Sequence, residues 1–250
     1  IVGGAGVDSL TGGAGDDVYS VTTVGHFIGL AEAETLVGGE GNDNLSFDEN
    51  ATITIAATDL LALSSVDRIT IDGAANAGSI TLTDAVYTAN GLDTLRIIDG
   101  DLTTGTLSVT GSALTGTNAI HVTANTSTGV NDTLTGGAGA DTFVFSGAAG
   151  LEATDTVVGG AGADTIALSA AAAVTAVMTG VNTVETLAIS GNGGDISITL
   201  GADTVIAASS SLTADASSVT NTAFDLFYDG SAVTTATKSQ IVTGTSGVDT

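Results

Sequence analysis

The sequence lacks cysteine, proline and tryptophan, and it carries very little positive charge. Without cysteine there is no disulfide framework, and cysteine usage cannot identify the cellular compartment. The basic residues are Arg68, Arg96 and Lys238, against 28 acidic residues, so the formal net charge is -25. Because nucleic acids and anionic membrane surfaces repel so acidic a chain, the composition excludes both as partners.

Long hydrophobic runs are also missing. The longest weakly polar stretch, residues 170–178, is too short to span a bilayer, so no transmembrane segment is predicted. The chain begins with Ile1 and has no basic n-region, so we expect no N-terminal signal peptide and interpret the sequence as a segment of a longer protein. An acidic, thiol-free composition rich in Thr, Gly and Asn is typical of exported bacterial proteins.

Hydrophobic residues nevertheless make up 43% of the chain, which argues against disorder. Short runs that alternate apolar and polar residues predict strands of an all-β fold. We expect strands at residues 52–55, 69–71, 80–82, 95–98, 107–110, 119–122, 187–189, 196–198 and 224–228. The only candidates for helix are residues 58–63 and 170–177. We expect Tyr19, Phe143 and Phe145 in the core, and the cluster Phe224, Phe227 and Tyr228 in the core or a subunit contact.

A nine-residue motif opens the chain and repeats at once, with three glycines, an aspartate at the sixth position and an apolar residue at the eighth. Glycine permits the left-handed turns and the close approach of carbonyl groups that such a loop needs. Carbonyl and carboxylate oxygens together are the ligands that calcium prefers. Crowded carboxylates without basic partners also favour a bound cation. The motif therefore predicts a calcium-binding turn followed by a short strand.

Five units match this motif in full: Gly3-Asp8-Leu10, Gly12-Asp17-Tyr19, Gly38-Asp43-Leu45, Gly136-Asp141-Phe143 and Gly159-Asp164-Ile166. Degenerate units lie nine residues before three of them, at Gly29-Glu34-Leu36, Ser127-Asp132-Leu134 and Gly150-Asp155-Val157, and residues 244–250 begin another. A single unit would be a weak signal in a chain with 35 glycines, but this number of units is a strong one.

The pattern G-G-x-G-x-D-x-apolar-x resembles that of RTX proteins, and the resemblance implies a parallel β-roll or β-helix solenoid that binds several Ca²⁺ ions between stacked turns. It assigns the metal ligands to Asp8, Asp17, Glu34, Asp43, Asp132, Asp141, Asp155, Asp164 and Asp249, with the turn glycines Gly3, Gly6, Gly12, Gly15, Gly38, Gly41, Gly136, Gly139, Gly159 and Gly162.

Stacked turns in such a roll are expected 18 residues apart, which places Asp8 and Asp17 on opposite sides. If residues 21–28 serve as a metal-free half-coil, the Asp17 turn stacks on the Glu34 turn. If residues 145–149 do the same, the Asp141 turn stacks on the Asp155 turn.

The two arrays indicate a duplication. We predict one copy of array plus β-solenoid at residues 1–126, a second at 127–243, and the start of a further RTX unit at 244–250. Thr250 stops at the seventh position of a nonapeptide, and Ile1 and Val2 would supply the eighth and ninth. We therefore expect tandem or end-to-end copies, with Asp249 of one copy near Asp17 of the next.

Catalytic motifs are absent from the sequence. His26 and His121 stand outside any motif, and there is no G-x-S-x-G, no H-E-x-x-H and no lysine-bearing nucleotide loop, so we expect no enzymatic activity.

Three functions remain. The leading hypothesis is a secreted calcium-binding structural repeat of a bacterial surface layer, extracellular filament or adhesin, resembling the repeat regions of surface-layer proteins and large adhesins. Its expected export route is type I secretion, its location extracellular or at the cell surface, and its partners further copies of itself and cell-surface polysaccharide. The alternative is a C-terminal export and folding module of a type I secreted enzyme or toxin. A carbohydrate- or ice-binding module would need a flat, regular face of threonine or aromatic side chains.

Overall fold

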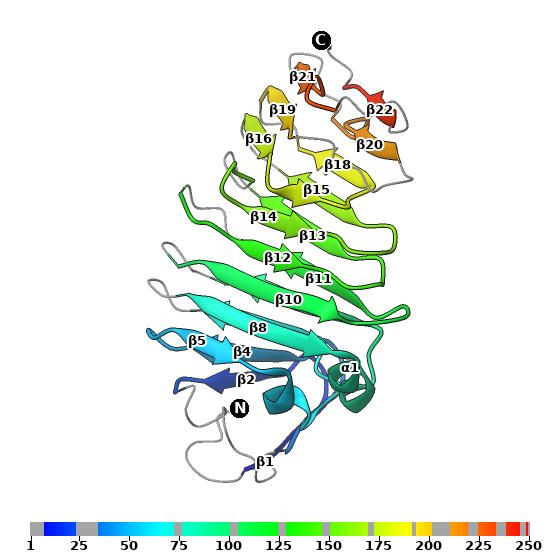
Figure 1. The fold of residues 1–250 in the computed structure, drawn as a ribbon. Helices are drawn as coiled ribbons and strands as arrows, with labels where there is room; N and C mark the ends of the chain where they lie inside the picture. The colour runs from blue at the N-terminus through cyan, green and yellow to red at the C-terminus, as the bar shows by residue number, and fades with distance from the viewer. Residues whose placement is uncertain are drawn as a thin grey trace.

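The computed structural model describes residues 8–23, 35–72, 77–100, 105–124, 129–146, 151–169, 173–191, 194–201, 211–219, 225–233, 239–245 and 249. Over these residues the chain winds into a solenoid of parallel strands, with β1 near one end and β22 near the other (Figure 1). The predicted all-β solenoid is therefore confirmed.

One long sheet runs the length of the solenoid. Its strands lie in chain order and pair in parallel, so each coil adds one strand beside the strand of the previous coil. They are β2 (Val18–Val21), β4 (Asn44–Asp48), β7 (Arg68–Asp72), β9 (Thr94–Asp99), β11 (Ala119–Thr123), β13 (Thr142–Ser146), β15 (Thr165–Ser169), β18 (Thr186–Ser190), β20 (Ser211–Asp215) and β22 (Ser239–Thr243).

Three smaller parallel sheets take the remaining strands. The first contains β1 (Ser9–Ala14), β3 (Thr35–Glu40) and β6 (Leu63–Ser64). The second contains β5 (Ile53–Ile55), β8 (Gly78–Thr83), β10 (Leu107–Ala113), β12 (Thr133–Thr135), β14 (Thr156–Val158) and β17 (Val181–Asn182). The third contains β16 (Val174–Met178), β19 (Ile196–Leu200) and β21 (Leu226–Asp229).

The core lies between these sheets because alternate side chains of each strand point inward. In β13, for example, Phe143 and Phe145 are buried while Thr142 and Val144 are partly exposed. Tyr19 is also buried, and its hydroxyl donates a hydrogen bond to the Val37 carbonyl at 2.6 Å. The prediction that these three aromatic residues belong to the core is confirmed. In the C-terminal cluster, Phe227 is exposed, Tyr228 packs against the core, and Phe224 lies outside the described residues.

Helix is confined to short segments. Around residues 58–63, where helix was expected, there is a 3-10 helix, η2 (Ala57–Leu60). The helix expected at 170–177 is wrong from Val174 onward, where β16 pairs with β19, and residues 170–172 lie outside the described part.

The α-helix α1 (Asp84–Asn90) was not expected, because seven residues give too little periodicity to distinguish it from the strand before it. The Asn90-Gly91 pair ends this helix: Gly91 adopts φ 75° and its N–H donates to the Tyr87 carbonyl.

The long sheet passes through the proposed copy boundary at residue 126 without a break, since β11 pairs with β13. The division into copies at 1–126, 127–243 and 244–250 stays a prediction about the duplicated sequence. Within the described ranges, no helix is long and apolar enough to cross a membrane.

A matched pair of leucines tests the core. Leu45 of β4 is fully buried, whereas Leu61, just after η2, is 45% exposed. We expect Leu45→Ala to lower the free energy of unfolding by about 2–5 kcal/mol because it leaves a cavity. Leu61→Ala should change it by less than about 0.5 kcal/mol. Urea unfolding at constant calcium concentration measures both; similar losses in the two variants would contradict this core.

Candidate metal site

Two pairs of G-G-x-G-x-D turns stack directly on each other in neighbouring coils. In the first pair, residues 12–17 lie beside residues 38–43, with Gly13 in register with Gly39 and Val18 in register with Asn44. In the second pair, residues 136–141 lie beside residues 159–164, and Thr142 is in register with Thr165. Each pair thus brings equivalent positions of two motifs together.

The sixth-position aspartates form a column along one side of the solenoid. The Asp17 N–H donates to Asp43 Oδ1 at 2.9 Å, and the Asp141 N–H donates to Asp164 Oδ1 at 2.8 Å. Asp141 Oδ1 in turn accepts the Ile120 N–H of the preceding coil. One oxygen of each of these three carboxylates, Asp43, Asp141 and Asp164, therefore binds the backbone of the coil before it.

The predicted pairing of turns is wrong in both arrays. Asp17 stacks on Asp43 rather than on Glu34, and Asp141 stacks on Asp164 rather than on Asp155. The stacked aspartates are 26 residues apart in the first array and 23 in the second, not 18. Two nonapeptides and the insert that follows them together make one coil, so the insert lengthens the coil and does not form a half-coil of its own.

A second row of aspartates lies at the other end of the smaller-sheet strands. Asp8 precedes β1 and Asp17 follows it, so these two residues lie at opposite ends of the strand, as expected. Asp132 Oδ1 accepts the Leu107 N–H, and Asp155 Oδ1 accepts the Asp132 N–H. Asp155 Oδ2 accepts the Glu152 N–H, so both oxygens of this carboxylate are bound within the chain.

Several carboxylate oxygens in these rows have no hydrogen-bond partner although they are buried. They are Oδ2 of Asp8, Asp17, Asp43 and Asp164. An unpaired buried carboxylate oxygen is costly, and a bound cation removes that cost. Asp17 and Asp43 belong to one pair of stacked turns and Asp164 to the other, so the turns at 12–17, 38–43 and 159–164 fit a cation best.

The first glycine of each motif makes room for this oxygen. A Cβ at Gly12, Gly38, Gly136 or Gly159 would collide with Oδ2 of the aspartate five residues later. The glycines at the fourth position, Gly15, Gly41 and Gly162, have φ values between 99° and 136°, a region that favours glycine. Gly139 lacks such a φ, but a Cβ there would collide with the Asn118 carbonyl oxygen.

The second glycines were missing from the predicted site, although the doubled glycine of the motif was a visible signal. A Cβ at Gly39 would collide with the Gly13 carbonyl oxygen, and one at Gly160 with the Gly137 carbonyl oxygen. Carbonyl groups of one turn therefore point at the neighbouring turn. Such oxygens, added to Asp Oδ2, are the hard oxygen donors that calcium takes at 2.3–2.6 Å in proteins generally.

Two further acids extend the column beyond the motifs. Asp67 Oδ2 accepts the Asp43 N–H, and Glu185 Oε2 accepts the Asp164 N–H, both at 2.8 Å. Each follows a residue with positive φ, Ser65 at 54° and Thr183 at 52°. The sequence signal was the shared pattern of residues 64–67 and 182–185, which lie one coil after the last full motif of each array.

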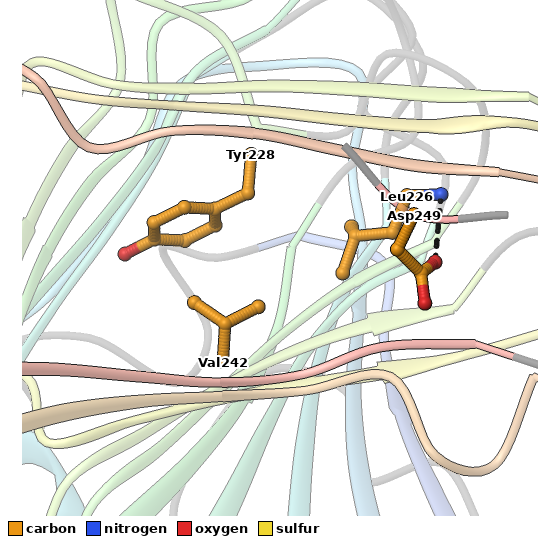
Figure 2. A pocket seen from close by; sticks show the side chains of 4 residues that line it. All are labelled: Leu226, Tyr228, Val242 and Asp249. Carbon is orange, nitrogen blue, oxygen red and sulfur yellow. Dashed lines mark hydrogen bonds between the residues drawn. The ribbon is translucent and has the colours of Figure 1, made fainter.

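The structure shows less about the remaining predicted ligands. Gly3, Gly6 and Glu34 lie outside the described residues. Asp249 repeats the motif geometry at the last coil, since its Oδ2 lies against Gly244 and its Oδ1 accepts the Leu226 N–H at 3.3 Å. Beside it lies an open pocket of about 270 Å³ lined by Leu226, Tyr228, Val242 and Asp249, where Tyr228 and Val242 point toward each other (Figure 2). The lining is mostly apolar, so the pocket provides no second set of ligands.

Burial raises the pKa of Asp141, Asp155 and Asp164 above the ordinary aspartate value. For Asp164 the pKa rises to about 7, chiefly through burial and further through the nearby charges of Asp141 and Glu185, against the lowering effect of the Asp141 N–H. Without a metal ion, the surroundings of these three carboxyl groups therefore disfavour the charged carboxylate form. A bound cation would favour that form instead.

Across the part of the chain that the structure describes, no three Asp, Glu or His side chains gather around one point in the manner of a metal centre. A cation in these turns must therefore be held by one or two carboxylates together with backbone carbonyl groups. That donor set suits calcium and not zinc or copper.

Comparison with known families agrees with this geometry. The model of the RTX calcium-binding nonapeptide repeat matches four times, at residues 1–20, 28–46, 128–147 and 149–170. The chain carries RTX calcium-binding repeats. The matches cover both stacked pairs of RTX turns. They do not include the partial unit at residues 244–250. No curated protein and no solved structure matches the chain.

Removing one charge from an RTX turn tests the ligand assignment. Asp164→Asn keeps a side-chain oxygen to accept the Asp141 N–H but removes the charge of the carboxylate whose Oδ2 has no hydrogen-bond partner. We expect calorimetry to show calcium affinity at least about tenfold lower, since a charged ligand is lost. The control is Asp48→Asn on β4, where the side chain is exposed to solvent. Equal affinities in the two variants would refute the assignment.

The raised pKa of Asp164 predicts a pH dependence in protein dialysed free of calcium. A carboxyl group with a raised folded-state pKa binds its proton more tightly when folded, so its contribution favours folding at low pH. We expect the urea midpoint to fall as pH rises from the ordinary value of 3.8 toward about 7. The fall should be smaller in Asp164→Asn and should disappear in saturating calcium. A midpoint that rises over this window would contradict the prediction.

Proposed function

We propose that this chain is a structural segment of an extracellular bacterial assembly, such as a surface layer, filament or adhesin, which calcium orders and holds together. The observation that carries the proposal is the pair of stacked RTX turns in each array, with buried carboxylate oxygens that lack hydrogen-bond partners. Calcium bound there joins neighbouring coils, so metal binding and folding are coupled.

The proposal assigns no catalysis to the chain. Within the described ranges, the His121 ring lies 3.4 Å from an Arg96 guanidinium nitrogen, and its pKa is lowered by burial and by that arginine. Among the residues that the structure describes, it has no serine or carboxylate hydrogen-bond partner of the kind that a hydrolytic triad needs. The pocket beside Asp249 is lined by apolar side chains and Tyr228, whose pKa burial raises to about 12. Neither place offers a group poised for acid–base chemistry.

Secretion by a type I system follows from the same coupling. In low cytosolic calcium the carboxylate columns repel one another and disfavour the folded solenoid, which suits export of an unfolded chain. Outside the cell, sites with dissociation constants of about 10⁻⁴ to 10⁻³ M are filled. We therefore propose an extracellular or cell-surface location.

Further copies of the chain are the proposed partners, as tandem repeats or as subunits. The first and last strands of the long sheet both expose apolar side chains, Val18 on β2 and Ile241 and Val242 on β22. Because every pairing in that sheet is parallel and in chain order, a strand equivalent to β2 can continue it after β22. Asp249 binds the first N–H of β21 in the third sheet, so it would lie in the row of Asp8 of the next copy and not, as expected, near Asp17. Cell-surface polysaccharide is the second proposed partner.

A calcium titration tests this function. We expect circular dichroism to show a gain of β-structure and light scattering to show assembly over the same calcium range, both reversed by a chelator. The same titration of Asp43→Asn/Asp164→Asn should be shifted to higher calcium, because one carboxylate charge is lost from each stacked pair of turns. Unchanged spectra and an unchanged hydrodynamic radius after complete calcium removal would refute the proposal.

The same titration distinguishes the proposed structural function from the alternative, which is an export and folding module of a type I secreted enzyme or toxin. Such a module would gain structure with calcium but would stay monomeric. Assembly that depends on calcium favours the structural function, and folding without assembly favours the module.

A further inference from the structure

The positive charge of this acidic chain is concentrated on the outer face of the long sheet. Arg68 of β7 is in register with Arg96 of β9, and Arg96 is in register with His121 of β11. Two of the three Lys and Arg residues of the whole chain thus lie directly beside each other. Like charges at opposed positions of neighbouring strands destabilise a sheet unless something neutralises them.

The chain itself does not neutralise them within the part that the structure describes. Arg68 Nε is buried and has no hydrogen-bond partner. The one described polar contact of the Arg96 side chain is with the His121 ring, at 3.4 Å from Nη2 to Nε2. Since arginine can only donate, His121 Nε2 accepts, which leaves its N–H at Nδ1. Three donors therefore lie on one face without a carboxylate, in a chain with 28 acidic residues.

A row of hydroxyl groups continues this basic row along the sheet. In register after His121 come Thr142, Thr165, Thr186 and Thr213, each partly exposed and each on the next strand. Neighbouring strands of a sheet lie about 4.8 Å apart, so the whole row from Arg68 to Thr213 is about 30 Å long.

On one side of the row, the neighbouring side chains of the outer face are short and uncharged over most of its length. The parallel row of β11, β13, β15 and β18 contains Thr123, Val144, Ala167 and Ala188, and a carboxylate follows only at Asp215 of β20. The hydroxyl row is therefore accessible from that side, while the carboxylate column, with the partly exposed Asp67 and Glu185, borders its other side.

We propose that this row, Arg68–Arg96–His121 continued by the four threonines, is a binding site for an acidic polysaccharide. A carboxylate of the sugar chain is held by the two guanidinium groups and the His121 Nδ1–H, and the sugar hydroxyls bind the threonine hydroxyls. Arginine suits planar oxyanions because its donors form a rigid fork. The site would give the proposed cell-surface function its polysaccharide partner, and it rests on that function.

An extended sugar chain fits the row better than a second copy of this chain does. The row is long and lined with hydroxyls, and only one end of it is charged, which matches a ligand with many hydroxyl groups and sparse carboxylates. Further copies of the chain are proposed to continue the long sheet beyond β22, so they would meet it at the ends of the solenoid and leave this face open.

Calorimetry with the whole chain in saturating calcium tests the site, with hexagalacturonate as the probe and maltohexaose as its neutral counterpart. We expect the wild type to bind hexagalacturonate and to bind maltohexaose far more weakly. Arg68→Gln and Arg96→Gln should each weaken hexagalacturonate binding at least about tenfold, since each removes a charged hydrogen bond. Lys238→Gln changes the net charge by the same amount and should alter the affinity by less than about twofold.

Thr165→Val and Thr186→Val should weaken binding several-fold while keeping side-chain size. Absence of binding to the wild type, or equal binding to the wild type and the two arginine variants, overturns the site. Binding that survives Arg68→Gln/Arg96→Gln and is lost on chelation would place the sugar on calcium at the RTX turns, and also overturns it.

Calcium-driven compaction, recorded on the same samples by small-angle scattering, separates this inference from the proposed function. Compaction without sugar binding overturns the row alone. If the arginine variants lose calcium-driven assembly but keep sugar binding, the arginines contact a neighbouring copy, which overturns the polysaccharide site.

Discussion

The fold depends on how buried carboxylates of neighbouring coils are kept next to each other. In the column through Asp17, Asp43 and Asp67, each acid after the first binds the backbone N–H of the acid before it, and Asp141, Asp164 and Glu185 repeat this arrangement. At a strand spacing of about 4.8 Å, two like charges cost roughly 3 kcal/mol at an effective dielectric constant of 20. A hydrogen bond to a charged group contributes about 1.5–3 kcal/mol, so one backbone contact offsets this repulsion only in part. A bound cation would neutralise the remaining repulsion, and the glycine at the first position of each motif leaves space for the carboxylate oxygen that would hold it.

Most of the fold could be predicted from the sequence because its signals are local. Alternation of apolar and polar residues correctly located strands such as β7, β8, β18 and β19, and the repeated glycines and aspartates correctly indicated a parallel solenoid with metal-binding turns. What could not be predicted was which turn lies beside which. That depends on the full length of a coil, and the sequence does not show whether residues 21–28 form a half-coil or lengthen one.

The metal-site residues, like the fold, could be predicted from the sequence only in part. Asp17, Asp43 and Asp164 were identified by the motif, and the structure adds that each has a buried oxygen without a hydrogen-bond partner. Asp155 was identified by the same motif, but its two oxygens already bind backbone N–H groups, which depends on the local path of residues 152–155. Asp67 and Glu185 lie outside the glycine pattern. Their role became visible only when the register placed them one coil beyond Asp43 and Asp164.

The unequal coils, 26 residues in the first array and 23 in the second, bear on how such a chain evolves. Both lengths keep the strand-to-strand register of the long sheet, because each coil contacts only its neighbours. Insertions and deletions between coils are then tolerated by the core and by the RTX turns alike. Repeat number and coil size can drift between lineages while the turns stay aligned, so a family built this way diverges in length faster than in architecture.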